Sequence, residues 1–242
     1  MDNIRIRRIL AFVKERKSCS MQELMEKFGV SSATIHRDIV ALAARDAIER
    51  VRGGVVYREV VDPGDLASAY QDRVIANRAE KIAAAKKALD IIEEGDIIFL
   101  DSSTTTYELA LLLTRCELDH LTIITNSVPV MHIFRKYPAR WSMIGLGGNY
   151  DPQLNSILGV SAHEQLSRYN ITKAFISAFG LDSKTATTNH EHQAEILRKV
   201  LDAADKRYLI IDHTKIGRKG LYRIAARGGF DAIMTDQAPK GK

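Results

Sequence analysis

Short apolar runs that alternate with amphipathic segments after residue 95 constrain the fold of this chain most strongly. Each run is a few residues long and β-prone, which is typical of buried strands, and helical patterns separate most of them. This alternation predicts an α/β fold, a largely parallel sheet with helices on both faces. The runs are Ile97–Leu100, Leu121–Thr125, Trp141–Gly145, Ala174–Ser177, Tyr208–Ile211 and Ala232–Met234.

Polar residues directly follow several of these runs, at the carboxyl ends of the expected strands, where open α/β sheets bind ligands. The strongest such segment is Asp101-Ser102-Ser103-Thr104-Thr105-Thr106, which leads into a helical pattern. Hydroxyl groups and amides at a helix N-terminus favour a phosphate monoester, although a Ser/Thr run can also simply cap the helix. We expect anion binding here. The other segments are Thr125-Asn126-Ser127, Gly147-Gly148-Asn149-Tyr150-Asp151, Gly180-Leu181-Asp182 and Asp212-His213-Thr214-Lys215.

The first sixty residues begin with two short helical patterns joined by a turn. Apolar side chains recur at helical spacing from Ile6 to Val13, with arginines between them. Ser20 followed by Glu23 predicts a capping box at the start of a second helix. Gly29 is expected to end that helix, because glycine is at ease with a positive φ, and Val30 is expected to fill the turn.

A third helix and a hairpin follow. The helix is expected in the stretch Ser31-Ser32-Ala33-Thr34-Ile35-His36-Arg37-Asp38-Ile39, with its apolar positions inward and its polar positions outward. The hairpin is expected at Val51-Arg52-Gly53-Gly54-Val55, where β-prone residues flank a Gly-Gly turn. This order is typical of a winged helix-turn-helix, which places its recognition helix in the major groove of DNA.

Candidate DNA contacts follow from the chemistry of the outward stripe. Arg37 can form a bidentate pair with guanine, hydroxyl groups can bind phosphates, and His36 can donate to a phosphate or a base. Arg52, at the hairpin tip, is expected to reach the minor groove or the DNA backbone. Each residue alone could be an ordinary surface group, but together they predict DNA binding. The predicted contacts are Ser31, Ser32, Thr34, His36, Arg37 and Arg52.

Charge and composition agree with a nucleic-acid partner. Residues 1–60 hold 12 basic and 8 acidic residues, a net charge of +4 out of +5 for the whole chain. Cys19 and Cys116 lack metal-ligand spacing and are expected to be reduced thiols. The sequence shows neither a signal-peptide pattern nor an apolar run that could span a bilayer. We therefore expect a cytoplasmic protein without membrane contact.

These motifs resemble the DeoR-type family of bacterial repressors. That family shows Arg-x-x-x-Ile near its start, Val-Ser-x-x-Thr-Ile-Arg/His-Arg-Asp-Leu in its third helix, and Gly-Gly after the wing arginine. This chain has Arg5-Ile6-Arg7-Arg8-Ile9, Val30-Ser31-Ser32-Ala33-Thr34-Ile35-His36-Arg37-Asp38-Ile39 and Arg52-Gly53-Gly54. We expect Asp38 to face its own domain and orient a basic side chain, with a carboxylate on the helix surface as the alternative.

Residues 75–236 are similar to the sugar-phosphate-sensing domain of the same family, whose fold is similar to ribose-5-phosphate isomerase and related isomerases. On the connecting helix, expected from about Ser68 to Glu93, Arg73 and Lys81 match an Arg and a Lys of similar proteins. They could be ligand groups or ordinary charged surface. The resemblance implies that the Ser102–Thr106 loop holds the phosphate. The predicted effector contacts are Asp101, Ser102, Ser103, Thr104, Thr105, Asn126, Gly147, Gly148 and Lys215.

The chain departs from the family pattern at four positions of this second domain. Ser103 replaces a glycine in the phosphate loop, and Ala186 replaces a glycine after the Gly-x-Asp segment. Gln193 and Leu197 stand where a glutamate and a lysine are common. The ligand chemistry could therefore differ from that of the family's usual sugar phosphates.

Two more specific interpretations, a metal site and a dinucleotide-binding loop, have less support than the alternatives to them. Asn189-His190-Glu191-His192 could hold a metal, but no third ligand is evident and a solvated cluster is favoured. Gly145-Leu146-Gly147-Gly148 begins like a dinucleotide-binding fingerprint but lacks its last glycine. We expect no catalytic residues, no metal and no cofactor.

The sequence predicts a winged helix-turn-helix at 1–60, a linker at 61–75 and an α/β sensor domain at 76–242. The expected function is a transcriptional regulator, a repressor of carbohydrate-metabolism genes, controlled by a phosphorylated sugar or related metabolite. Its partners would be double-stranded operator DNA and a second or further copies, as a homodimer or homotetramer. Two alternatives remain: an isomerase fused to a DNA-binding module, with Asp101, Asp182 or Asp212 as base, and a regulator whose sensor is vestigial.

Overall fold

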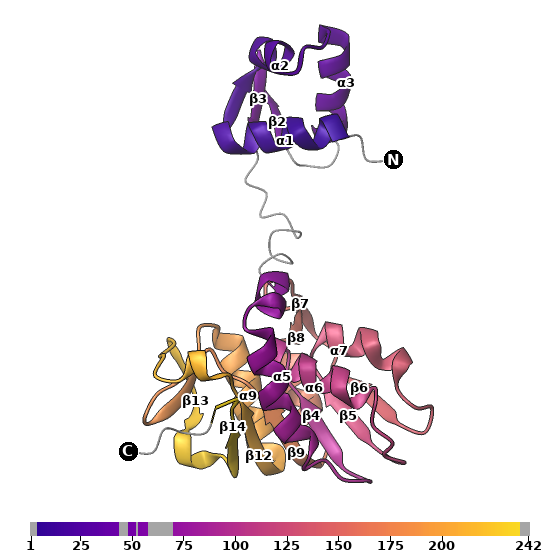
Figure 1. Cartoon of the computed structure of the whole chain (residues 1–242), viewed down its shortest axis with the longest axis vertical. Helices are drawn as coiled ribbons and strands as arrows, with labels where there is room; N and C mark the ends of the chain where they lie inside the picture. Colours follow the sequence, from indigo (N-terminus) through magenta and orange to yellow (C-terminus); the bar gives the residue numbers. More distant parts are fainter. Residues whose placement is uncertain (1–3, 44–47, 52, 58–69, 238–242) are drawn as a thin grey trace. The chain divides into compact units, whose positions relative to one another are not determined.

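A computed structural model describes residues 4–43, 48–51, 53–57 and 70–237, with the backbone alone at Ile4, Arg7 and Tyr57. Contacts divide the chain into two units, Met1–Asp65 and Leu66–Lys242. Figure 1 shows both units. Within the described residues, no helix is long and apolar enough to cross a membrane.

The N-terminal unit has the predicted helices and hairpin. Ser20 caps α2 in a complete capping box with Glu23, and Gly29 ends α2 in the left-handed region at φ 61°, so both predictions are confirmed. The three strands form an antiparallel sheet in the order β1-β3-β2. The elements are α1 (Ile4–Arg16), β1 (Ser18–Ser20), α2 (Met21–Phe28), α3 (Ser32–Ala43), β2 (Ile48–Val51) and β3 (Gly54–Tyr57).

One apolar cluster holds these elements together. Ile9 of α1, Leu24 of α2 and Ile35 and Ile39 of α3 are fully buried in it, beside Val55 of β3. The inward stripe of α3 predicted from its helical spacing is therefore confirmed, and the opposite stripe is left for solvent or a partner.

The C-terminal unit is built on a parallel six-stranded sheet in the order β14-β12-β9-β4-β5-β6. All six apolar runs of the sequence form these strands, so the predicted α/β fold is confirmed. The strands are β4 (Ile97–Leu100), β5 (Thr122–Thr125), β6 (Ser142–Gly145), β9 (Ile171–Ile176), β12 (Ala204–Ile210) and β14 (Ala232–Met234).

Helices cover both faces of this sheet, with α5 and α6 in front and α9 behind in Figure 1. Ile98 and Leu100 pack toward α5 and α6, whereas Phe99 between them packs toward α8 and α9, as the alternation of side chains along a strand requires. The helices are α5 (Arg78–Leu89), α6 (Thr104–Leu113), α7 (Val128–Ile133), α8 (Val160–Leu166) and α9 (Glu191–Ala203), with 3-10 turns η1 (Phe134–Lys136), η2 (His213–Lys215) and η3 (Arg227–Gly229).

Three features of the C-terminal unit differ from the expectations. The connecting helix breaks: residues 70–75 are helical, Asn77 has φ 51°, and α5 then runs only to Leu89. A hairpin of β7 (Asn149–Asp151) and β8 (Ser156–Leu158) was not predicted. Nor was an antiparallel sheet in the order β10-β11-β13, made of β10 (Gly180–Leu181), β11 (Thr185–Thr188) and β13 (Tyr222–Ala226).

Gly54 provides a test of the packing in the N-terminal unit. A Cβ at Gly54 would overlap the carbonyl oxygen of Cys19 on β1, so the β1–β3 pairing would have to shift. Gly54→Ala should lower the free energy of unfolding of this unit by about 1–3 kcal/mol. The measurement is urea unfolding by far-ultraviolet circular dichroism, compared with the fluorescence of Trp141, the chain's single tryptophan, which reports on the C-terminal unit.

The control is Gly228→Ala, because a Cβ at Gly228 meets nothing within 4 Å. It should leave both signals unchanged. Equal circular dichroism transitions for wild type and Gly54→Ala would contradict the packing described here.

Candidate nucleic-acid interface and anion-binding cavity

The outward face of α3 presents the predicted DNA-binding side chains together. Ser32, His36 and Arg37 are exposed, as is Ser31 just before the helix, while Thr34 is half-buried. The Ser31 Oγ lies 3.0 Å from the Thr34 Oγ1, so these two hydroxyl groups stabilise the first turn. Arg52 lies outside the described residues, and its predicted contact is not placed.

A salt bridge fixes α3 against α1. Asp38 is 4% exposed, and its carboxylate accepts hydrogen bonds from Arg5 Nε at 2.6 Å and Nη2 at 3.2 Å. The neighbouring carboxylate raises the pKa of Arg5. The prediction that Asp38 faces its own domain and orients a basic side chain is confirmed. This pair leaves Arg37 on the exposed side of the helix.

In the C-terminal unit, the strand order changes direction between β4 and β9, which is where open α/β sheets form a crevice for ligands. Asp101 follows β4 and Ser177 follows β9. The fully buried Asp101 accepts hydrogen bonds from Ser103 N at 3.0 Å, from Thr106 Oγ1 at 2.6 Å and, through its other oxygen, from Ser177 N at 2.9 Å. The carboxylate therefore ties the two loops together across the crevice.

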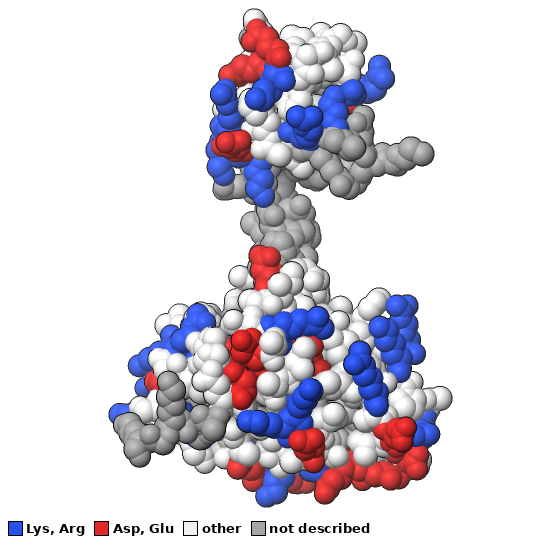
Figure 2. Space-filling model, in the orientation of Figure 1, with Lys and Arg blue, Asp and Glu red and all other residues white. Residues whose placement is uncertain are grey.

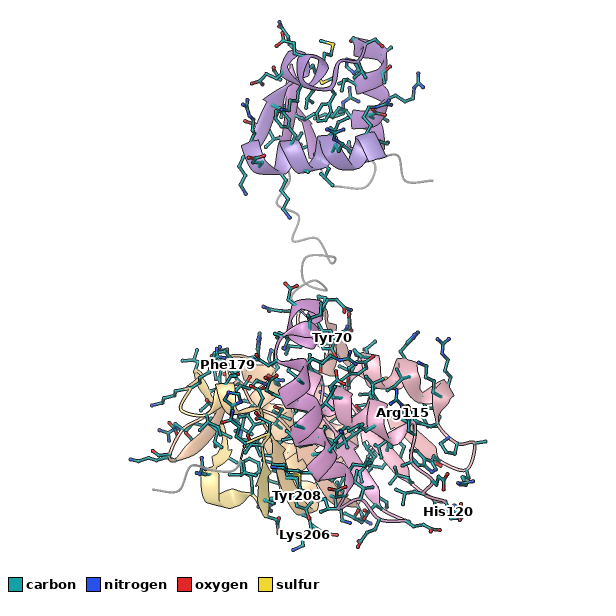
Figure 3. The ribbon with its side chains drawn as sticks, viewed as in Figure 1. Tyr70, Arg115, His120, Phe179, Lys206 and Tyr208 are labelled. Carbon is teal, nitrogen blue, oxygen red and sulfur yellow. The ribbon has the colours of Figure 1, made fainter. Side chains whose placement is uncertain are left out.

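A cavity of about 560 Å³, which we call the anion cavity, opens at this edge of the sheet. Figure 3 shows Phe179 and Tyr70 at the opposite edge of the unit from His120 and Lys206, which precede or begin their strands. The walls of the cavity come from the loops after β4, β9 and β12, from the turn between β7 and β8, from the segment that joins β11 to α9, and from residues 72–81. The lining residues are Asp72, Arg73, Ala76, Asn77, Lys81, Ser103, Thr104, Gln153, Leu154, Ser177, Ala178, Phe179, Thr188, Asn189, His190, Gln193, Asp212, Thr214, Lys215 and Arg218.

The N-terminus of α6 lies at this cavity. Ser103 is its N-cap, accepting a hydrogen bond from Thr106 N, and Ser103 and Thr104 both line the cavity. The first amides of a helix have no partner within the helix and carry its positive end. Ser177 lines the same cavity, is 2% exposed, and its hydroxyl has no hydrogen-bond partner among the described residues. These groups are suited to receive an anion.

Two amines, on the buried Lys81 and the half-buried Lys215, add positive charge. Burial and the nearby Lys215 cation lower the pKa of Lys81 to about 8, and Lys81 Nζ donates to the carbonyl of Arg73. Burial also lowers the pKa of Lys215, although its Nζ lies 3.7 Å from the Asp212 Oδ2. Arg218 completes the set, with its guanidinium 4.4 Å from the centre of the Phe179 ring. In Figure 2, acidic side chains gather instead along the lower edge of this unit.

Residues 70–77, which we call the entry segment, form one wall of the cavity. Arg73 Nη2 donates to the Gln153 carbonyl at 2.8 Å, and Asn77 Nδ2 donates to the Thr214 Oγ1 at 3.1 Å. Tyr70 is 2% exposed, its hydroxyl has no hydrogen-bond partner within the described part of the chain, and burial raises its pKa. The entry segment is thus attached to the cavity by a few polar contacts and one buried ring.

The predicted effector contacts divide into two groups. Ser103, Thr104 and Lys215 line the cavity, whereas the remaining six do not. Asp101 holds the two loops together, and Ser102 and Thr105 are buried beneath them, with hydroxyl groups that find no hydrogen-bond partner among the residues that the structure describes. The other three, Asn126, Gly147 and Gly148, make internal contacts.

Those internal contacts account for the three residues. Asn126 donates to Ser156 Oγ at 2.8 Å, which attaches β8 to the end of β5. Gly147 exchanges hydrogen bonds with the Gln165 side chain of α8, and a Cβ at Gly148 would meet the Leu158 carbonyl. These three residues hold the β7–β8 hairpin and α8 in place, and they do not themselves line the cavity.

The structure also locates the four residues that depart from the family pattern. Gln193 lines the cavity and accepts a hydrogen bond from the Thr188 hydroxyl at 2.6 Å. Leu197 and Ala186 are buried in the apolar core, and Ser103 caps α6. Only Ser103 and Gln193 of the four line the cavity, with neutral polar groups.

Several cavity residues lie outside the predicted set. Ser177 closes an apolar run, so the end of its strand is a signal for it, whereas Thr188, His190 and Arg218 come from segments around β11 and after η2, where the sequence predicts no strand. His192 pairs with Glu195 at 3.2 Å on α9, and within the described ranges no cluster could hold a metal.

Comparisons with known proteins cover both units. Residues 76–237 match the family profile described as "DeoR C terminal sensor domain". Residues 5–60 match the profile described as "DeoR-like helix-turn-helix domain".

Similar proteins match nearly the whole chain. The HTH-type transcriptional regulator IolR of Bacillus subtilis is 32% identical over 240 residues, covering 98% of this chain and 92% of that protein. The lactose phosphotransferase system repressor of Staphylococcus epidermidis is 29% identical, covering 96% and 91%. The L-fucose operon activator of Haemophilus influenzae is also 29% identical, covering 98% and 92%.

Among solved structures, ribose 5-phosphate isomerase A from Methanocaldococcus jannaschii has a TM-score of 0.43 at 17% identity. The match covers 58% of this chain and 55% of that one. A likeness at this level gives no information about activity.

The charge state of Lys81 predicts a pH dependence for anion binding. Below its pKa of about 8 the amine is protonated and attracts an anion, and above it the charge is lost. Since a phosphate monoester is already doubly charged above its own pKa of about 6, affinity should fall as pH rises from ~7 to ~9.5. The measurement is calorimetric titration with hexose 6-phosphates and inorganic phosphate.

Lys81→Met is the matched variant, because it keeps an unbranched chain of similar length without a titrating group. Its affinity should be lower near neutral pH and should fall less steeply with pH than that of the wild type, and the remaining slope comes from Lys215, whose pKa is also lowered. A variant with the full wild-type slope would show that Lys81 is not the titrating group.

Proposed function

This chain belongs to the DeoR family of transcriptional regulators, and we propose that it represses genes of carbohydrate metabolism under the control of a phosphorylated sugar. The N-terminal unit would bind operator DNA through the exposed face of α3. The anion cavity would bind the effector. The names of the similar regulators, which concern lactose and fucose systems, support the carbohydrate assignment.

The observation that carries the effector proposal is a pair of buried polar atoms that lack hydrogen bonds inside a cationic cavity. Ser177 Oγ and Asp212 Oδ2 both belong to lining residues, and neither has a hydrogen-bond partner among the described residues, although Asp212 Oδ2 lies 3.7 Å from Lys215 Nζ. An unmade hydrogen bond at a buried group such as the Ser177 hydroxyl costs about 1–3 kcal/mol, so a ligand that makes these hydrogen bonds gains affinity. A sugar hydroxyl can donate to Asp212, and a phosphate can accept from Ser177.

The phosphate would lie at the N-terminus of α6. Thr104 and its neighbours offer the first amides of that helix, and Lys215 and Lys81 supply charge in a partly dry site. The neutral amide and hydroxyl groups of Asn189, Gln193 and Thr188 would face the sugar ring. In this arrangement, the helix N-terminus and the lysines would bind the phosphate, and the neutral polar side chains would bind the sugar ring.

The entry segment suggests how binding would be communicated. It lines the cavity and lies next in sequence to the residues that join the two units. An effector that contacts Arg73 or Asn77 would stabilise one arrangement of this segment over others. A ligand shifts a conformational equilibrium only through such a difference in affinity.

We propose that the regulator binds as a homodimer or homotetramer. Winged helix-turn-helix proteins pair two recognition helices with two half-sites, so palindromic operators match two-fold symmetric proteins.

The isomerase alternative depends on a carboxylate positioned as a base. Asp101 has both oxygens engaged by backbone amides, and Asp182 accepts from Lys184 N and Thr185 N in a turn. Asp212 is the candidate that reaches the cavity, where it also serves to bind a sugar hydroxyl. Turnover of aldose phosphates would favour the enzyme, and a screen with no thermal stabilisation by any phosphorylated sugar would favour a vestigial sensor.

Arg37→Ala tests the DNA-binding face. Losing a bidentate contact to guanine should weaken operator binding by about 1–3 kcal/mol and relax specificity at one base pair. Binding is measured at fixed salt on the wild-type operator and on operators changed at single positions.

Arg16→Ala is the matched control, because Arg16 is exposed at the end of α1 and pairs with Glu23. It should keep the specificity unchanged. Unchanged affinity and specificity in Arg37→Ala would remove α3 as the recognition helix.

Lys215→Ala tests the cavity. The variant should bind operator DNA with unchanged affinity but lose its response to the phosphorylated sugar, because one of the cations that line the cavity is gone. The measurement is effector-dependent release of labelled operator. Lys219→Ala, an exposed lysine four residues later, is the control. A normal response in Lys215→Ala would place the effector elsewhere.

A further inference from the structure

An exposed valine sits in the middle of the DNA-facing side of α3. Val40 is 50% exposed, whereas Ile39, one residue before it, and Leu42, two residues after it, are buried in the core. The core cluster of the N-terminal unit does not include Val40. Valine is also a poor choice for an exposed helical position on local grounds, because its branched Cβ restricts the side chain in a helix.

An exposed apolar side chain is common on protein surfaces, so the position of Val40 carries the argument. Successive helical residues are rotated by about 100°, which places Val40 within about 20° of Ala33 and between His36 and Arg37. Ala33, His36 and Arg37 are all exposed. Ala33 and Val40 therefore form an apolar strip with an imidazole on one side and a guanidinium on the other.

DNA offers one matching group in the major groove. The C5-methyl of thymine is the apolar feature of that surface, and small apolar side chains contact it. Val40 follows Arg37 by three residues, about 4.5 Å along the helix, which is close to the base-pair rise of about 3.4 Å. A thymine one or two base pairs from the guanine bound by Arg37 would lie beside Val40.

We infer that Val40 reads the C5-methyl of a thymine in each operator half-site, so that the half-site contains a thymine next to the guanine contacted by Arg37. This inference rests on the proposed role of α3 as the recognition helix. It adds a specificity determinant that hydrogen-bonding chemistry alone does not reveal. Removing the methyl group then removes buried apolar surface without changing any hydrogen bond.

The experiment replaces thymine by deoxyuridine, which lacks only that methyl group. The full-length protein first selects its operator from random DNA, and each thymine of the selected site is then replaced singly. The wild-type protein should lose about fourfold in affinity at one thymine per half-site, the value of one buried methylene-sized group. Thymines outside that position should tolerate the change.

Val40→Ala completes a double-mutant cycle. This variant should bind the thymine operator about fourfold more weakly than wild type and should show no further loss with deoxyuridine. Val40→Thr, which keeps one methyl group, should retain part of the sensitivity. The control Val56→Ala changes another partly exposed valine, which lies on β3 and is 37% exposed. It should keep the full sensitivity to deoxyuridine, because the thymine C5-methyl is accessible only from the major groove.

Two results would overturn the inference: a wild-type protein indifferent to deoxyuridine at every thymine, or a Val40→Ala variant that keeps the wild-type penalty. Arg37→Ala separates this failure from that of the proposed function. If Arg37→Ala weakens binding while the deoxyuridine test fails, α3 still reads DNA and only Val40 is misassigned. If neither variant affects binding, α3 is not the recognition helix and both proposals fall.

Discussion

A buried carboxylate at the switch point of the sheet determines the geometry of the anion cavity. Asp101 accepts amide hydrogen bonds from the loops after β4 and β9. These two strands are neighbours in the sheet, although the first residue of β9 follows the first residue of β4 by 74 positions in the sequence. Burial raises its pKa, and its hydrogen bonds to Ser103, Ser177 and Thr106 oppose that shift. Because the carboxylate holds both loops, the N-terminus of α6 and the Ser177 hydroxyl open into one cavity.

Local signals made much of the fold predictable from the sequence. Ser20 and Glu23 define a capping box within four residues, and Gly29 is the residue that a left-handed helix end favours. The apolar runs form the strands of the central sheet, because a strand that is buried on both faces needs apolar side chains on both faces. The motif that the third helix shares with the family predicts that Asp38 faces its own domain, and the Arg5 pair agrees with that prediction.

The cavity was only partly predictable, because its walls come from segments that no local pattern brings together. Asn126 and Gly148 follow strands, as ligand residues do, yet their groups are used to hold the β7–β8 hairpin. Arg218 and His190 reach the cavity through the small β10-β11-β13 sheet and the segment after η2, whose short strands carry weak signals. The break at Asn77, which lets the entry segment form a wall, depends on a left-handed residue inside an otherwise helical pattern.

If a phosphorylated sugar binds in the anion cavity and thereby controls DNA binding, the sugar should slow amide hydrogen exchange around that cavity. The measurement uses the full chain and a phosphorylated sugar that releases the operator. Exchange should be slower at the N-terminus of α6, at residues 177–179 and in the entry segment. Protection confined to segments away from the cavity, such as α7 or the edge near His120, would contradict binding in the anion cavity.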